Sequence, residues 1–212
     1  MTPTDLLNIA ELGITTGNAW TTKYAAFNPG FITKVAYLAH HVTMRDTILA
    51  QITTNDARSQ TVLALKAVNA DITKYSKFIK TYLQEEYDDD AKTYYAGYGI
   101  ITSGKSHTIP TDNDHRMRSL DTLIAELAKT NNPLQDKKYG LAFWTDLRDR
   151  HRLNWTNKKT YDGNRSINSN SLTMAKKEAV SYQTRLRASI KIMYLDNYKS
   201  ILRDFGFQSE KY

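Results

Sequence analysis

The sequence predicts an all-α fold, namely an antiparallel helical bundle with two long helices and several shorter ones. Three observations predict it. Apolar residues recur at spacings of three and four over long stretches. No convincing alternating strand is bounded by turn residues, so a substantial sheet is not expected. Asparagine–proline pairs and glycines stand where helices would begin and end. Composition agrees, because 41% hydrophobic and 24% charged residues among 212 are ordinary for a globular chain.

The N-terminal residues 1–27 are expected to form a docking arm. It holds a short helix over 6–12 that ends at Gly13, a typical C-terminal position for glycine. Asn28-Pro29 then reads as a cap followed by a first-turn proline, which predicts a helix to about residue 51.

The next helix carries the clearest periodic pattern. Thr54-Asn55-Asp56 offers a cap, and a long helix is expected over about 56–95. Its apolar stripe has the a and d spacing of a helix that pairs with another. The stripe consists of Leu65, Val68, Ile72, Tyr75, Ile79 and Tyr82.

The second half of the chain predicts three further helices. One is capped within 111–113, and another begins at Asn132-Pro133. Residues 156–171 are rich in Asn, Ser, Thr, Lys and Gly, so they are expected to form an exposed loop. A last long helix is expected over about 172–204, ending at Phe205-Gly206.

The bundle, residues 28–212, also divides into two halves, 28–100 and 111–207. Each half contains Ala-Val followed fifteen positions later by Tyr-Leu, starting at Ala67 and at Ala179. Each ends in an aromatic-Gly-apolar triplet, which raises the hypothesis of a duplicated helical unit, although the flanking residues do not align in phase.

The chain has a net charge of +7, and the charged residues are distributed unevenly along it. Residues 1–112 hold 10 Lys/Arg and 11 Asp/Glu, whereas 113–212 hold 19 and 11. A basic C-terminal half suits a polyanion, an acidic partner or contact between copies. The absence of cysteine excludes a disulfide scaffold, a thiolate zinc site and a cysteine nucleophile. No secretory signal or membrane-length apolar run is evident, so a cytoplasmic protein without membrane contact is expected.

One nucleotide-binding pattern occurs. Residues 99–106 fit G-x-x-x-x-G-K-[ST] through Gly99, Gly104, Lys105 and Ser106. Taken alone, the motif resembles that of the P-loop NTPases, which would imply phosphate binding by the loop and magnesium binding by the serine. A flexible glycine loop is the preferred interpretation, because the residues before it look helical and Pro110 breaks the helix that should follow.

No metal, cofactor or catalytic residue is predicted. The acidic run at 85–90 lacks the spaced ligands of a calcium loop, and His40 and His41 diverge by about 100° on a helix. His151 has arginine neighbours and could act in RNA cleavage, but a solvated basic face is the simpler interpretation.

The leading functional hypothesis is a non-enzymatic structural or adaptor protein that acts through protein–protein contacts or as a homo-oligomer. Its acidic residues are expected to meet a basic surface on a neighbour. The acidic residues are Glu85, Glu86, Asp88, Asp89 and Asp90, and the basic ones are Arg148, Arg150, Arg152, Arg185 and Arg187. The alternative is nucleic-acid binding by the basic half, with Trp144, Trp155 and Tyr161 stacking on bases.

Overall fold

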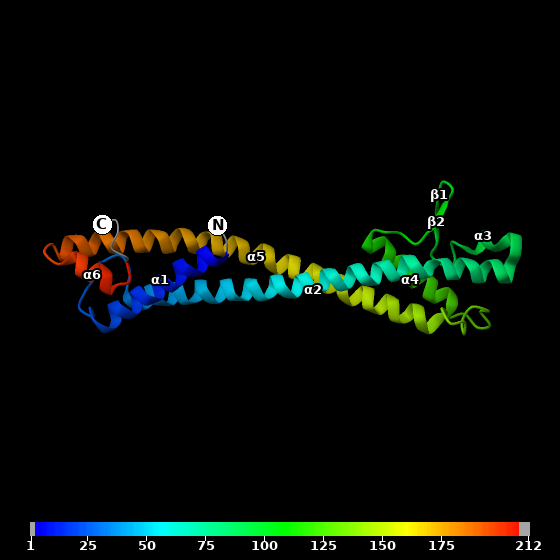
Figure 1. Ribbon diagram of the computed structural model, residues 1–212, viewed down its shortest axis with the longest axis horizontal. Coiled ribbons are helices and arrows are strands. Elements are labelled where there is room, and N and C mark those ends of the chain that lie inside the picture. The colour runs from blue at the N-terminus through cyan, green and yellow to red at the C-terminus, as the bar shows by residue number, and fades with distance from the viewer. Residues whose placement is uncertain (1–2, 208–212) are drawn as a thin grey trace. The chain divides into compact units, whose positions relative to one another are not determined.

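The computed structural model describes residues 3–207, with side chains from Asp5 onward, and confirms the all-α prediction (Figure 1). The helices are α1 (Pro3–Thr22), α2 (Lys34–Tyr87), a 3-10 turn (Asp88–Asp90), α3 (Ala91–Tyr94), α4 (Asn113–Leu127), α5 (Leu141–Met193) and α6 (Tyr198–Asp204). The first two residues of the predicted docking arm and the last five of the predicted bundle lie outside the described residues. Within the described part, no helix is both long and apolar enough to cross a membrane.

The chain divides into two compact units, and α2 and α5 contribute to both. Unit 1 contains the described residues up to Asp56 and from Gly163 onward, and unit 2 contains Ala57–Asp162. The two long helices run antiparallel in each unit. In unit 1 the His40 ring lies 3.1 Å from the carbonyl oxygen of Ala175, and in unit 2 Asp71 pairs with Arg150. The predicted halves and the duplication stay predictions.

Unit 1 is built around aromatic side chains. The helix α1 packs closely on α2. Its glycines Gly13 and Gly17 lie against His41 and Leu38, and because glycine has no side chain, the two helices can approach each other there. The indole of Trp20 is buried and donates a hydrogen bond to the carbonyl oxygen of Phe27. The other buried residues of this aromatic cluster are Tyr37, Leu186, Ile190, Ile201, Leu202, Phe205 and Phe207. A second buried cluster of unit 1 consists of Ala10, Met44, Ile48, Leu172 and Ala179.

Unit 2 has a separate apolar core, and it confirms the predicted stripe of α2. Buried residues of that stripe meet α4, α5 and the segment that precedes the hairpin. The core contains Val68, Ile72, Ile79, Leu83, Tyr95, Tyr98, Leu120, Leu123, Leu127, Leu134, Trp144 and Leu147. Asp112 caps α4, as predicted for 111–113, by accepting a hydrogen bond from the backbone N–H of His115.

The predicted break between two helices at 54–56 is wrong, because α2 runs through it without interruption. The hydroxyl of Thr54 donates to the carbonyl oxygen of Ala50 one turn back, so it does not cap a new helix. The helix α2 also begins later than predicted, at Lys34 rather than at Asn28-Pro29. Asn28 accepts a hydrogen bond from the N–H of Gly30 in a turn, and Thr33 accepts one from Ala36 at the actual helix start.

The predicted exposed loop at 156–171 is wrong as well, since α5 is helical throughout this stretch. Contacts with α2 hold it: Asp162 binds Arg58, and Ser169 accepts a hydrogen bond from Gln51 at 3.3 Å. Tertiary packing therefore overrides the weak helix propensity of Asn, Ser and Gly. The predicted helix over 172–204 is interrupted after Met193, and α6 ends before Gly206, which has a positive φ of 85°.

Two smaller predictions also differ from the structure. The first helix continues through Gly13 to Thr22 rather than ending at Gly13. Asn132 forms a turn by accepting a hydrogen bond from Leu134, and the helix expected there begins only at Leu141. One small antiparallel hairpin is present, formed by β1 (Ile101–Ser103) and β2 (Ser106–Thr108), and it stands out from the helices of unit 2 (Figure 1).

Candidate partner-binding site

The candidate site is formed by the C-terminal third of α2 and the hairpin, both in unit 2. Ile72, Ile79 and Leu83 anchor this part of α2 in the core. Since an α-helix has 3.6 residues per turn, the residues on the opposite side must face outward. That side carries Lys74, Lys77, Thr81, Gln84 and Glu85, all of them exposed.

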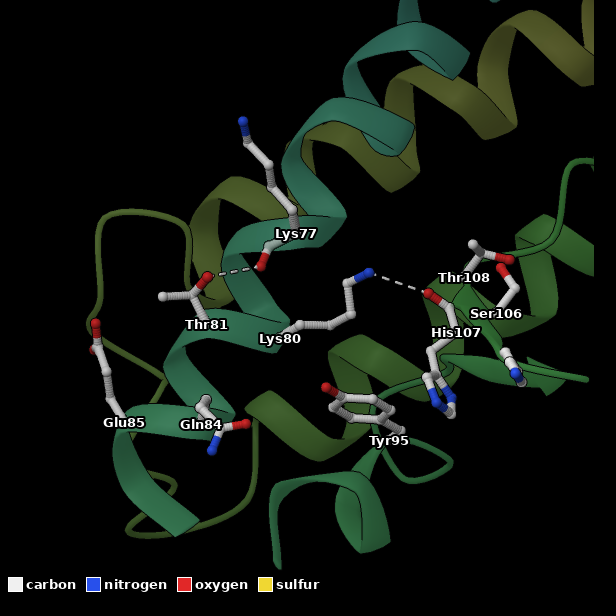
Figure 2. Close-up of a pocket in the computed structure, with 10 residues that line it drawn as sticks. Lys77, Lys80, Thr81, Gln84, Glu85, Tyr95, Ser106, His107 and Thr108 are labelled. Atoms are coloured by element: carbon white, nitrogen blue, oxygen red, sulfur yellow. Dashed lines mark hydrogen bonds between the residues drawn. The ribbon is translucent and has the colours of Figure 1, made fainter. Parts of the chain in front are cut away.

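A groove of about 780 Å³ lies between α2 and the hairpin (Figure 2). Its lining residues are Lys77, Lys80, Thr81, Gln84, Glu85, Tyr95, Lys105, Ser106, His107 and Thr108. Figure 2 shows Lys80 reaching from α2 toward the hairpin, whereas Lys77, Thr81 and Glu85 leave α2 on the side away from it. The groove therefore has a basic interior and a charged outer rim.

One hydrogen bond joins the hairpin to α2, and further contacts orient the ring of His107. The ammonium of Lys80 donates to the carbonyl oxygen of His107 at 3.1 Å. The ring of His107 lies edge-on to the mostly buried Tyr95, with centroids 5.2 Å apart, and its Nδ1 is 2.9 Å from the hydroxyl oxygen of Thr102. Among the described residues, no carboxylate orients this imidazole and no hydrogen bond joins it to Ser106.

The glycine motif at 99–106 forms the hairpin rather than a phosphate loop. A Cβ atom at Gly99 would stand 2.1 Å from the carbonyl oxygen of Ser119, so this glycine permits close packing on α4. Gly104 has a φ of 59° in the turn between the strands. Lys105 completes that turn and Ser106 begins β2, whereas a phosphate loop needs a helix to begin at this point.

The predicted acidic residues form the end of α2 and the turn after it. Glu85, Glu86 and Asp88–Asp90 are all exposed. Asp88 adopts a left-handed backbone conformation with a φ of 46°, and its carbonyl oxygen accepts a hydrogen bond from Gln84. Burial, together with the adjacent Tyr94 ring and Glu86, raises the pKa of Tyr87. Within the described residues, no group of three His, Asp or Glu side chains is arranged to hold a metal ion.

The three predicted arginines of α5 that belong to unit 2 bind carboxylates of that unit. Arg148 pairs with Asp121 and Asp149, Arg152 also pairs with Asp121, and Arg150 pairs with Asp71 and Asp146. These intramolecular ion pairs leave less positive charge for an external partner.

Arg185 and Arg187 belong to unit 1 and lie over aromatic rings. The Arg185 guanidinium is 4.0 Å from the centroid of Phe31, and that of Arg187 is 5.0 Å from the centroid of Phe207. The structure therefore does not place the five predicted arginines within a single compact unit.

Two of the three residues proposed for base stacking, Trp144 and Trp155, are also engaged within the chain. Trp144 is fully buried, and the indole N–H of Trp155 donates to Asp114 at 2.9 Å while Lys158 and Lys159 lie over its ring. The prediction that His151 lies on a solvated face is wrong, because the ring is completely buried. Asn113 contacts its Nε2 at 3.1 Å, and burial, followed by the nearby charge of Arg116, lowers the pKa of His151 to about 4.

Nine charged residues at the candidate site take part in no ion pair within the described part of the chain. Among residues 3–207, none of the ion pairs involves Lys74, Lys77, Lys80, Lys105 or the acidic residues of 85–90. Sequence reasoning identified the acidic residues, and Lys105 as part of the glycine motif, but missed the lysines of α2. Their spacing of three residues just before the acidic run is the signal that could have found them.

Comparison of the chain with protein-family models, with curated proteins and with solved structures found no match.

Proposed function

We propose that this protein is a non-enzymatic helical adaptor that acts through protein–protein contacts, and that its groove receives an acidic segment of a partner. One observation carries the proposal. Lys80 and Lys105 line one groove and Lys77 lies at its outer rim, and among residues 3–207 none of the three forms an ion pair. Elsewhere in unit 2, Arg58, Lys158 and the predicted arginines of α5 are ion-paired within the chain.

The lining of the groove also supports binding of a peptide segment. It includes the polar side chains of Thr81, Gln84 and Ser106, which can form hydrogen bonds with a partner. Complementary charges across an interface increase its specificity and its association rate, and the affinity of such an interface falls as the salt concentration rises.

Calorimetric titration with a glutamate-rich peptide, at low salt and low protein concentration, tests the proposal. Binding is expected to weaken roughly tenfold or more in the variant Lys77→Gln/Lys105→Gln, because it removes two of the three groove cations. Lys66→Gln is the matched control, since Lys66 is an exposed lysine of α2 in the same unit but outside the groove. The proposal fails if the wild-type protein does not bind the peptide, or if both variants bind it equally well.

A further inference from the structure

We infer that the acidic segment is the end of α2 in a second copy of this chain, and that the two α2 helices lie antiparallel across a two-fold axis at Thr81. The inference rests on the proposed function, because it names a partner for the outer rim of the groove, where Lys77, Thr81 and Glu85 point away from the hairpin. It is carried by the positions of the unpaired charges along one face of α2.

The spacing of these charges is symmetric about Thr81. Lys77 precedes Thr81 by four residues and Glu85 follows it by four, whereas Lys74 precedes it by seven and Asp88 follows it by seven. Intervals of four and seven residues correspond to about one and two helical turns, so Lys74, Lys77, Thr81 and Glu85 share one face of α2. Asp88 directly follows the last residue of the helix.

This face is accessible in the structure. All five side chains are exposed, and Figure 2 shows Lys77, Thr81 and Glu85 pointing away from the hairpin on the same side of α2. The short side chain of Thr81 permits close approach at the axis. Its hydroxyl is already used within the helix, since it donates to the carbonyl oxygen of Lys77 at 3.1 Å.

A two-fold axis makes the face complementary to itself. Lys77 of each copy then faces Glu85 of the partner subunit, and Lys74 faces Asp88 of the partner subunit. One self-complementary patch thus supplies four ion pairs and closes the assembly as a dimer. A parallel arrangement in the same register would place lysine against lysine and carboxylate against carboxylate, which is repulsive.

The same observations predict a weak dimer that responds strongly to salt. Within the described range 73–90, no large apolar side chain is exposed, so little hydrophobic area is available for burial. Exposed ion pairs contribute little individually, and salt screens them. Dimerisation is therefore expected at high protein concentration and at low ionic strength.

Sedimentation velocity on the full chain tests the register. The wild-type protein should dimerise at about 0.01 M ionic strength, where the Debye length is about 30 Å, and should dissociate at about 1 M, where it is about 3 Å. Lys77→Glu alone and Glu85→Lys alone each convert two attractive pairs into repulsive ones. Each is expected to weaken the dimer roughly tenfold or more. Asp88 is left unchanged because its positive φ would strain a lysine.

Two combinations restore complementarity. An equimolar mixture of the Lys77→Glu and Glu85→Lys proteins should form a heterodimer, and the double variant Lys77→Glu/Glu85→Lys should form a homodimer again. Lys66→Glu is the control, because it changes the same net charge at an exposed position of α2 outside the proposed interface. This control should dimerise nearly as well as the wild-type protein.

The outcomes separate this inference from the proposed function. A wild-type protein that stays monomeric at low salt, yet binds the glutamate-rich peptide, would overturn the inference and leave the adaptor proposal standing. A dimer that is unaffected by Lys77→Glu, or not recovered in the mixture, would also overturn it. Absence of both dimerisation and peptide binding would overturn the two together.

Discussion

Gly13 of α1 lies directly against the imidazole ring of His41 on α2. A Cβ atom added at Gly13 would stand 1.8 Å from Cδ2 of His41 and 2.2 Å from its Cγ. The ring has little room to move, because it is fully buried and its Nδ1 lies 2.9 Å from the carbonyl oxygen of Tyr37. The two helices can approach this closely only because residue 13 has no side chain.

Gly13→Ala is therefore expected to destabilise the protein, even though alanine is intrinsically the better helix former by about 1 kcal/mol. Overpacking of a filled core typically costs about 1–3 kcal/mol, and the contact at Gly13 is closer than ordinary packing allows. Urea unfolding followed by circular dichroism measures the change in the free energy of unfolding. A stability equal to or above that of the wild-type protein would show that α1 does not pack on His41 as described.

Gly163→Ala should have the opposite effect. Gly163 is inside α5, its φ is not positive, and a Cβ atom there would meet nothing within 4 Å. Alanine should then stabilise the helix by about 1 kcal/mol through lower backbone entropy in the unfolded chain. The same urea experiment applies, and the two glycine variants control each other. A loss of stability in Gly163→Ala would argue against a continuous α5.

The fold class could be predicted from the sequence because apolar periodicity along α2 reports directly on burial. Most helix boundaries could not be predicted in this way, although the start of α4 could. Thr54 and the Asn- and Ser-rich stretch at 156–171 have the composition of caps and loops, but their local preference is weaker than long-range packing between α2 and α5. Gly13 illustrates the same limit, since a glycine needed for close helix packing looks in the sequence like a helix end.

The candidate site was predicted only in part. The acidic run was visible as a run of charges, but its basic counterpart was assigned to α5, where the sequence holds more arginines. Whether an arginine is free depends on carboxylates far along the chain, such as Asp71 for Arg150 and Asp121 for Arg152. Periodicity does not reveal such pairs. The symmetric spacing of Lys77 and Glu85 about Thr81 was available in the sequence, but it gains meaning only once these residues are known to be exposed.

Thr16 connects α1 with the end of α6 through a buried hydrogen bond. Its hydroxyl donates to the carbonyl oxygen of Phe205 at 2.7 Å. Thr16→Val keeps the shape but leaves that buried carbonyl without this donor, so a loss of about 1–3 kcal/mol in the free energy of unfolding is expected. Thr22→Val is the control, because the Thr22 hydroxyl bonds to its own helix at an exposed site. Equal effects of the two substitutions would contradict a role for the Thr16 contact.

Stability is expected to fall as the pH drops from about 6.5 to about 4. In the folded protein, burial lowers the pKa of His151 to about 4, whereas the unfolded residue titrates near 6.5. Between these values the unfolded chain binds the proton more readily, so acid favours unfolding. The full effect of His151 is about 3 kcal/mol and levels off below the folded pKa. Burial also lowers the pKa of His41, which adds a loss of the same sign.

The variant His151→Gln isolates the first contribution, because glutamine does not titrate. Urea unfolding at a series of pH values should show a shallower decline between about 6.5 and 4 than in the wild-type protein, whatever the stability of the variant at neutral pH. An unchanged slope in His151→Gln would mean that this ring is not held neutral beside Arg116. Carboxylates with lowered pKa values, such as Asp162 beside Lys158, act at lower pH, since they lose their ion pairs only as they protonate.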